Sequence, residues 1–443
     1  MEIVFLYLIS GVLAGTAAGL LPGIGLTATM VVLGGFLFAI EPIYSIVFYI
    51  AALCASQYIG SMVAICFGVP GEASSIPAVK EGYSLFLKGQ GSTAIGTTAI
   101  GSFVGSIRAA FVFFIIFPII QHLFLIWNTN IHTVIMIFAL LMVIAMSANT
   151  LVVSLLTIFV GINLGLTGIS FSTGIEWLTF GQPFLYSGLP VIPVLMGIFV
   201  LPELLKAFDA KQNYSNAAPK LTLSIIENIK LVKQHIGVVT YSSIVGFCAG
   251  VVPMLTVKLA SNVAYSIERL RQQRKNTYTQ GNLSCLISAE TSNNAACFSS
   301  MLPLLFLGIP IITSEYVLYD YITSSPTVFN IDYVVQHIDT LAISYVIINM
   351  FCLLLAWPAA NICLTLYRLP HKVLKLFSLF LVIFPVVYLG YRQDQTVFFI
   401  AVFLFASAIG ILFKKYDTLP MTFSFLLANE FMQSFIRFYQ INF

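Results

Sequence analysis

The segment GVPGEASS, residues 68–75, constrains the fold of this chain more than any other feature. It places glycines, a proline, an acid and two serines inside a long apolar region. Proline removes a backbone donor, and backbone groups freed in lipid have no water to bind. A break of this kind is tolerated where the freed groups are buried in protein or line a cavity, so the segment marks a candidate site.

Composition assigns the chain to the polytopic integral membrane proteins. Of its 443 residues, 59% are hydrophobic and 8% are charged, whereas soluble domains carry about 25% charged residues. The sequence predicts an all-α polytopic membrane protein with roughly 10–13 transmembrane or re-entrant helices, in two related halves with broken helices at the midplane. We expect no enzyme, because there is no room for a soluble catalytic domain and no hydrolase, P-loop or zinc motif.

Charges, histidines and cysteines bear on other classes of protein. The net charge of +3, with Lys and Arg in short loops, fits the cytoplasmic bias of basic loops and predicts no nucleic-acid partner. The five histidines lack ligand spacing, so no metal site or cofactor is expected. The seven cysteines lie without CxxC spacing and are interpreted as buried small residues. The amino terminus has no basic region before its apolar run and is interpreted as a retained first span.

The first half carries further features around its break. Gly11, Gly15 and Gly19 repeat at spacing four, which predicts close packing of one helix face. They precede LPGIG, residues 21–25, a second break that we interpret as functional because freed backbone groups at membrane depth normally face a cavity. A polar turn is expected over residues 80–91.

A weaker copy of the 68–75 segment stands in the second half as GIPIITS, residues 308–314. Pro310 follows Pro70 by 310 − 70 = 240 residues, and Pro253 follows Pro22 by 253 − 22 = 231. Repeats of this kind are typical of secondary transporters whose site lies between the halves. The sequence predicts a first membrane repeat over 1–205, a polar linker over 206–236 and a second repeat over 237–443. Parallel and inverted arrangements of the repeats both remain open.

The breaks create half-helix amino termini, where backbone N–H groups and the helix dipole favour a small anion. Nearby hydroxyl and amide groups add donors without fixed positive charge, and Glu72 or Glu290 is a candidate to coordinate Na⁺ or carry a proton. The alternative is that these polar side chains only hold helices together, and that Tyr58 is an interfacial anchor. The candidate substrate-binding residues are Pro22, Gly23, Gly25, Thr27, Tyr58, Ser61, Pro70, Gly71, Ser74, Ser75, Ser292, Asn293, Asn294, Pro310 and Ser314.

Several motifs together resemble the large membrane subunit of the tripartite tricarboxylate transporters, the TctA family. They are LPGIG at 21–25, YIGS at 58–61, GVPGEASS at 68–75, EGY at 81–83, TFG at 179–181, the GLPVIPVLMGIF run at 188–199, AETSNNA at 289–295 and LGIP at 307–310. The resemblance spans nearly the whole chain. It implies an ion-driven importer of citrate or another carboxylate in the bacterial inner membrane. It also implies two protein partners besides the lipid bilayer: a small membrane subunit and a periplasmic binding protein.

The second half departs from the family pattern. PMLT at 253–256 stands where a second Pro-Gly-x-Gly is typical, and Ile311 stands where glycine follows the second proline. Glycine lets the backbone approach a ligand closely. We therefore expect the first-half break at 68–75 to supply mainly backbone donors and its counterpart in the second half to supply mainly side chains. The competing hypothesis is a diverged membrane protein of the same fold that moves a different solute, for example a lipid-linked one, or acts as a scaffold.

Overall fold

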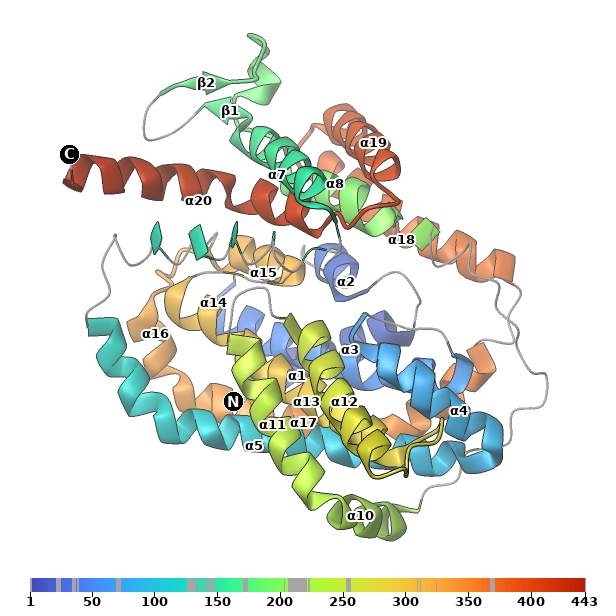
Figure 1. Cartoon of the computed structure of the whole chain (residues 1–443). Coiled ribbons are helices and arrows are strands. Elements are labelled where there is room, and N and C mark those ends of the chain that lie inside the picture. Colours follow the sequence, from blue (N-terminus) through green and yellow to red (C-terminus); the bar gives the residue numbers. More distant parts are fainter. Residues whose placement is uncertain are drawn as a thin grey trace. The chain divides into compact units, whose positions relative to one another are not determined.

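The structure of the 443-residue chain is a computed structural model (Figure 1). It describes residues 2–20, 25–33, 37, 40–68, 73–125, 133–134, 137–138, 140–141, 144, 147, 149–169, 174–202, 204–205, 221, 224–251, 256–308, 310, 312–323, 325–366 and 371–442. Most of these residues are helical, and β1 (Gly168–Ile169) and β2 (Glu176–Trp177) form a short antiparallel ribbon. The predicted all-α class is confirmed.

Several helices have the length and composition of membrane spans. In the described part of the chain, Glu2–Leu20, Pro42–Phe67, Ala78–Pro118 and Ile338–Thr365 are long and apolar enough to cross a bilayer. Shorter apolar helices, such as α11 (Ile236–Val251) and α19 (Thr396–Leu412), accompany them. The chain is therefore a multi-pass membrane protein, as its composition predicts.

The chain divides into two compact units, and each unit draws on both predicted halves. Unit 1 contains residues 1–115 and 207–378, and unit 2 contains residues 116–206 and 379–443. All four breaks predicted from the sequence, at 21–25, 68–75, 253–256 and 308–314, belong to unit 1. The division into repeats at 206–236 stays a prediction, and α10 (Ile225–Gln234) lies inside that stretch.

The glycine face of α1 (Glu2–Leu20) packs directly on α3 (Pro42–Phe67), which confirms the packing interpretation. A Cβ built on Gly11 would lie 2.4 Å from the carbonyl oxygen of Phe48, and one built on Gly15 would lie 2.1 Å from that of Ala52. No side chain fits at such a separation. Because both contact positions advance together along the chain, α1 and α3 run parallel.

The second half repeats this packing with α11 and α13 (Leu283–Ser300). A Cβ on Gly246 would lie 2.3 Å from the carbonyl oxygen of Ser292, and one on Gly250 would lie 2.5 Å from that of Ala296. Between these helices α12 (Thr256–Arg274) returns antiparallel to α13, and the Ser292 hydroxyl donates to the carbonyl of Ala260 at 3.0 Å. Of the seven cysteines, six are buried as predicted and Cys248 on α11 is exposed.

α3 and α14 (Leu302–Leu307) end with the same geometry. Gly68 follows α3 with φ 66° and ψ 21°, and Gly308 follows α14 with φ 65° and ψ 21°. Their N–H groups donate to the carbonyls of Ala64 and Leu304, each at 3.0 Å. A left-handed residue closes a helix most easily when it is glycine. The sequence therefore ends both helices at the first residue of the Gly-x-Pro copies.

The stretch after the first break corrects one expectation. The predicted polar turn over 80–91 is wrong, because η3 (Ala78–Gly82), α4 (Tyr83–Leu85) and η4 (Phe86–Gln90) lead helically into α5 (Gly91–Leu125). Within this stretch Gly89 departs from helical geometry, with φ 79°. Its one acid, Glu81, is fully buried, and its partners lie about two hundred residues away along the chain.

The two halves exchange contacts around their breaks. α2 (Gly25–Leu33), of the first half, packs on α15 (Thr313–Thr323), and the Tyr321 hydroxyl donates to the carbonyl of Met30 at 3.4 Å. Reciprocally, α12 packs on η2 (Ala73–Ser75), and the Ser261 hydroxyl donates to the carbonyl of Ser74 at 2.8 Å. α16 (Ile331–Gln336) and α17 (Ile338–Leu366) complete the second half of unit 1, and α17 packs on α3.

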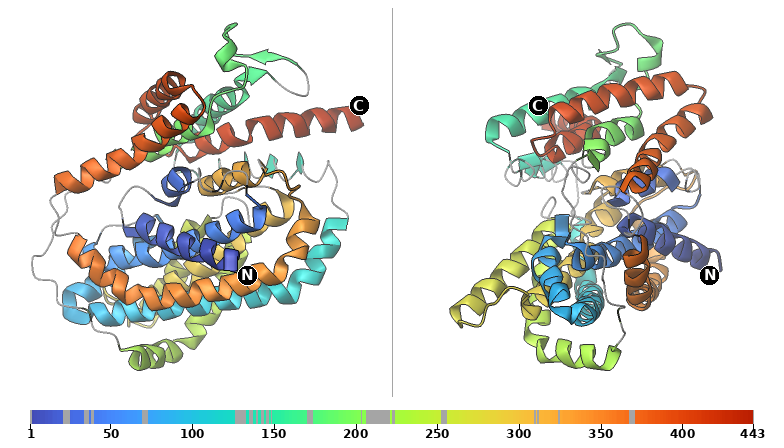
Figure 2. Two further views of the ribbon diagram at one scale, coloured as in Figure 1. Left: turned by 180° about the vertical axis from the view of Figure 1, so that it is seen from behind. Right: turned by 90° about the vertical axis from the view of Figure 1, so that its right-hand side faces the viewer.

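Unit 2 shows a similar exchange (Figure 2). α7 (Leu151–Leu166), from the first half, packs on α20 (Leu419–Asn442), and α19 packs on α8 (Val191–Leu195) and η6 (Met196–Val200). Glycines again allow close contact, since a Cβ on Gly165 would lie 2.1 Å from the carbonyl oxygen of Phe425. η5 (Pro183–Leu185) follows the β ribbon, and α18 (His371–Arg392), like α5, runs across the division between the units.

Candidate functional site

The structure places the described site candidates on the elements that flank the breaks of unit 1. Gly25 begins α2, which also carries Thr27, whereas Tyr58 and Ser61 lie on α3 and Ser74 and Ser75 lie in η2. Ser292, Asn293 and Asn294 lie on α13, and Pro310 and Ser314 follow Gly308. All of these side chains whose exposure is described are buried. Pro22, Gly23, Pro70, Gly71 and Glu72 lie outside the described residues, so their roles stay predictions.

Gln57 on α3 connects the first break to the second half. Its Oε1 accepts a hydrogen bond from the Ser74 hydroxyl at 3.0 Å and another from the Asn293 amide at 3.2 Å. Ser74 belongs to the 68–75 break, and Asn293 lies on α13 of the other half. The two stretches singled out in the sequence therefore meet at one buried amide.

One turn further along α3, a second bond joins the halves. The Ser61 hydroxyl donates to Oε2 of Glu290 at 2.6 Å, and Glu290 is fully buried. We call Gln57, Ser61, Ser74, Glu290 and Asn293 the cross-half cluster. Among the described residues, no Lys, Arg or His lies within ion-pair distance of the Glu290 carboxylate. A buried acid without a basic partner is costly as a bare anion, so the cluster is poised to take up a positive charge.

Gly60 is a buried glycine of α3 that is not packed against described side chains. Gly60 is buried, yet a Cβ built on it would meet no heavy atom within 4 Å. Gly60 lies beside α1, since a Cβ built on Gly19 would lie 3.0 Å from the backbone nitrogen of Gly60. Among the described residues, no side chain fills the space beside Gly60.

Other candidates are buried but belong to different contacts. The Tyr58 hydroxyl donates to Oδ1 of Asn349 on α17 at 3.3 Å, inside the helix bundle, so the interfacial-anchor alternative does not describe it. Ser314 shares a hydrogen bond of 3.0 Å with the hydroxyl of Tyr49. The Ser292 hydroxyl binds the carbonyl of Ala260, which is the helix-connecting role weighed as the alternative. These residues support the framework around the cluster.

Two important residues were not predicted as site residues. Gln57 was passed over although an amide in an apolar helix, four residues before Ser61, is a detectable signal. Glu81 was noted only within the EGY motif. Its carboxylate accepts hydrogen bonds from the hydroxyls of Tyr265 and Tyr278, at 2.9 Å and 2.8 Å, and from the N–H groups of Gly281 and Asn282, both at 2.8 Å.

Glu81 therefore holds the beginning of α13 in place. Asn282 caps this helix through its own side chain, which accepts from the N–H of Cys285, and Glu81 binds the two N–H groups just before it. Burial and the Glu81 carboxylate raise the pKa of the Tyr278 hydroxyl above its usual value, so this group keeps its proton and donates. The contact links the segment after the first break to the helix that carries Glu290 and Asn293.

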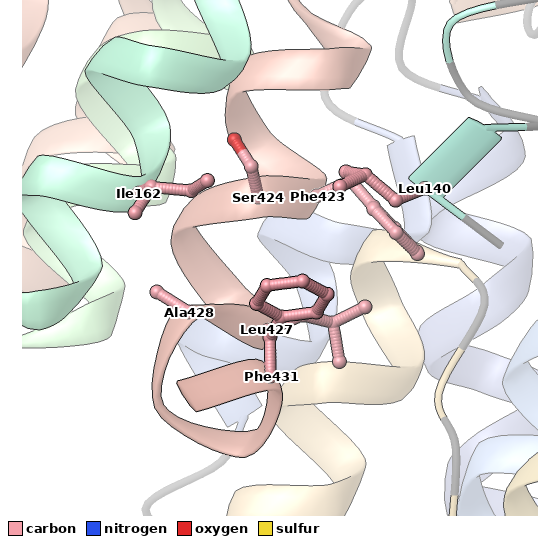
Figure 3. A pocket seen from close by; sticks show the side chains of 7 residues that line it. All are labelled: Leu140, Ile162, Phe423, Ser424, Leu427, Ala428 and Phe431. Atoms are coloured by element: carbon pink, nitrogen blue, oxygen red, sulfur yellow. The ribbon is translucent and has the colours of Figure 1, made fainter. Parts of the chain in front are cut away.

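Unit 2 contains a small pocket of different character (Figure 3). It is lined by Leu140, Ile162, Phe423, Ser424, Leu427, Ala428 and Phe431. Its one hydroxyl, on Ser424, donates to the carbonyl of Met421 in its own helix. The pocket thus offers apolar surface and no free polar group, so the candidate site lies in unit 1.

Comparisons with known proteins identify the family of the chain. The family model of the tripartite tricarboxylate transporter TctA family matches residues 5–423. An uncharacterized 52.8 kDa protein of Agrobacterium vitis, from the TAR-I ttuC′ 3′ region, is 31% identical over 326 residues, which cover 72% of this chain and 64% of that relative. The match spans less than two thirds of the relative's length, and no solved structure matches the chain significantly. Because the family model covers residues 5–423, nearly the whole chain and all four of its breaks, the chain belongs to the tripartite tricarboxylate transporter TctA family.

Proposed function

We propose that the chain is the large permease subunit of an ion-coupled carboxylate transporter in the bacterial inner membrane. Its substrate is citrate or another small tricarboxylate or dicarboxylate. The observation that carries the proposal is the cross-half cluster. In it Ser74 of the 68–75 break and residues of the other half meet at Gln57 and Ser61. Transporters built from two halves place their substrate where the halves and their broken helices meet.

The chemistry of the cluster suits a carboxylate that travels with a cation. Hydroxyl and amide groups and the backbone donors of the breaks replace the water of an anion without binding it irreversibly. A bare Glu290 carboxylate, fully buried, repels an anion at short range in a medium of low dielectric constant. Neutralising Glu290 with a proton or a cation removes that repulsion, so the substrate and the coupling ion bind together.

The proposed partners follow from the tripartite family. A small membrane subunit and a periplasmic binding protein complete the system, and the binding protein delivers the carboxylate. Glu72 and the prolines and glycines of the breaks are proposed to take part in binding, on the sequence argument alone. The first break supplies mainly backbone donors, and α13 supplies side chains.

Uptake of labelled citrate and succinate into vesicles tests this proposal. The vesicles contain the chain with both proposed partners, and the initial rate is measured with and without a Na⁺ or proton gradient. We expect Ser74→Ala and Gln57→Leu to lower uptake at least tenfold. Ser74→Ala removes the bond that ties the 68–75 break to Gln57, and Gln57→Leu also removes the bond to Asn293 of the other half. Ser300→Ala is the matched control, since that buried hydroxyl donates to the carbonyl of Cys297 in its own helix.

The outcomes separate the site from the function. Uptake that is unchanged in Ser74→Ala and Gln57→Leu contradicts the site assignment while keeping the transport activity. A wild type that takes up no carboxylic acid, with both partners present, contradicts carboxylate transport and favours a different solute or a scaffold.

A further inference from the structure

α13 carries an unusual group of buried oxygen atoms. In the described structure, Glu290 Oε1, Thr291 Oγ1, Asn293 Oδ1 and Asn294 Oδ1 have no hydrogen-bond partner. All four side chains are at most 1% exposed. Buried polar atoms normally have partners, because leaving one unpaired is costly. Four within five consecutive residues indicate a binding requirement that the protein itself does not meet.

The amide groups show which kind of ligand fits. The Asn293 nitrogen donates to Gln57, and the Asn294 nitrogen donates to the Ser102 hydroxyl at 2.7 Å. The Asn294 nitrogen also donates to the backbone carbonyl of Glu290 at 3.2 Å. Both amide nitrogens thus have acceptors in the protein, whereas both amide oxygens have no partner among the described residues. Residues 290, 293 and 294 share one helix face, since they stand three and four positions apart. This face is a set of acceptors and suits a cation.

We propose that Glu290, Asn293 and Asn294 bind one Na⁺ ion through Glu290 Oε1 and the two amide oxygens. A proton satisfies one of these oxygens, whereas a hard cation with oxygen ligands uses all three and neutralises the carboxylate. The inference rests on the ion-coupled transport proposed above and names its ion and ligands. At the offset of 240 residues, the matching positions of α3 are Ile50, Leu53 and Cys54, so one such ion binds per chain.

Na⁺ binding is measured on the purified full chain without substrate or partners, so that failure of transport does not affect it. The melting temperature is followed in detergent as NaCl replaces choline chloride at constant pH and ionic strength. We expect a saturable rise for the wild type, because a ligand of the folded state stabilises it. Glu290→Gln and Asn293→Leu are expected to raise the apparent Kd at least tenfold, and Ser300→Ala to leave it unchanged.

Two outcomes overturn the proposal. One is a wild-type melting temperature that is the same in NaCl and in choline chloride. A melting temperature that responds to pH and not to Na⁺ belongs to this outcome, because it indicates a proton carrier. The other is a Na⁺ response of wild-type affinity in a folded Glu290→Gln or Asn293→Leu variant. If Glu290→Gln does not fold, Asn293→Leu alone decides, because it removes a neutral oxygen and keeps the number and branching of the side-chain heavy atoms.

A second inference rests on a different observation, the matched packing of the two halves. Gly15 and Gly19 of α1 contact Ala52 and Ser56 of α3, and Gly246 and Gly250 of α11 contact Ser292 and Ala296 of α13. The residue numbers of matching glycines differ by 246 − 15 = 231, and those of the contacted residues differ by 292 − 52 = 240. These are the offsets of the proline pairs Pro22 and Pro253, and Pro70 and Pro310. Gly68 and Gly308, which end α3 and α14, also differ by 240. α13 is thus the counterpart of α3.

These counterpart helices run antiparallel to each other. Gln57 binds Asn293, and Ser61, four residues later on α3, binds Glu290, three residues earlier on α13. A rotation about the membrane normal would leave counterparts parallel. We infer that the halves are inverted repeats related by a pseudo-two-fold axis in the membrane plane. Because the helices are antiparallel, Ala55, two residues before Gln57, lies opposite Ala295, two residues after Asn293. Both are buried, and they are counterparts because they stand 240 residues apart. The axis therefore passes between them.

Labelling of single cysteines in intact cells and in inverted vesicles tests the inversion. Single cysteines are introduced into a variant that lacks the seven native ones. Glu41→Cys lies just before α3 and Gln280→Cys lies just before α13, and both positions are exposed. An impermeant maleimide is expected to reach them from opposite sides of the membrane. Lys88→Cys is the control for the second side, because the Lys88 ammonium donates to the carbonyl of Gln280 at 2.5 Å. Labelling of Glu41→Cys and Gln280→Cys from the same side overturns the inference.

Discussion

At the scale of single residues, the helix contacts of unit 1 depend on glycines that no other residue replaces. Gly15→Ala and Gly246→Ala each place a methyl group about 2 Å from a backbone carbonyl oxygen, at 2.1 Å and 2.3 Å. The helices must separate, so we expect each variant to lose about 1–3 kcal/mol of stability, the usual cost of overpacking. Thermal unfolding in detergent measures the loss. Gly237→Ala is the control, because a Cβ there meets nothing within 4 Å; a fall in its melting temperature equal to the others would contradict the packing argument.

Glu81 is the second residue whose removal has a predictable effect. Four donors converge on its carboxylate, and in Glu81→Gln the amide NH₂ faces donors instead of accepting from them. We expect a loss of at least about 2 kcal/mol, since buried donors remain unpaired. Tyr278→Phe removes one donor and should cost about 1 kcal/mol. Limited proteolysis near residues 275–282 reports whether this segment detaches; equal protection of Glu81→Gln and wild type would refute the anchoring role.

The residues that sequence reasoning found and missed differ in the range of their contacts. Gly11, Gly15 and Gly19 were correctly interpreted because a spacing of four is a local pattern with a local meaning. Glu81 looked like part of a solvated turn, because nothing near it in the chain shows that Gly281 and Asn282 bury it. Glu290 and Asn293 stood out as polar residues in an apolar stretch, but the sequence did not show that Gln57 is the side chain between the halves.

At the scale of elements, the two left-handed glycines that end α3 and α14 provide a matched pair. Gly308→Ala adds only the strain of a left-handed residue, about 1–2 kcal/mol, because a Cβ there meets nothing within 4 Å. Gly68→Ala adds the same strain and also places its Cβ 2.7 Å from the ring of Tyr83, which stacks on Phe86. We expect the melting temperature to fall in both variants and to fall further in Gly68→Ala.

A second variant gives this comparison its check. Gly68→Ala combined with Tyr83→Ala removes the clash and leaves the backbone strain. Relative to Tyr83→Ala alone, the cost of Gly68→Ala should then approach that of Gly308→Ala. A cost that stays larger would show that the first break is sensitive for a reason other than Tyr83.

The elements were predictable where proline and glycine set the backbone, and less so where tertiary contacts decide. The Gly-x-Pro copies marked the ends of α3 and α14 because a left-handed glycine is a property of the local backbone. The stretch 80–91 was predicted as a turn from its polar residues, yet it is helical, and its acid Glu81 has buried partners far away in the chain. The next helix, α5, is contacted by α10. Asn228 of α10 lies so close to Gly96 that a Cβ there would be 2.1 Å from its amide nitrogen.

At the scale of the whole molecule, the two compact units do not coincide with the two halves of the sequence. In unit 1, α12 of the second half packs on η2 of the first, and α15 packs on α2. In unit 2, α7 of the first half packs on α20, and α19 packs on α8 and η6. Each half thus contributes elements to both units, and each unit needs both halves to bury its helix faces. A repeat boundary read from the sequence does not reveal this exchange, because pairing between halves depends on contacts that a one-dimensional pattern does not contain.

This exchange predicts how the chain behaves when it is divided. If residues 1–220 and 221–443 are expressed as separate fragments, α7 loses α20 and α13 loses Gln57, Ser61 and Glu81. Each fragment alone should therefore aggregate or be degraded, whereas co-expressed fragments should assemble and co-purify through a tag on one of them. Size-exclusion chromatography in detergent measures the recovery of the complex. Glu81→Gln in the first fragment should lower that recovery, because its four bonds then have to form between two chains, while Gly237→Ala in the second should not. A fragment that folds alone as a stable monomer would show that the contacts between the halves are dispensable.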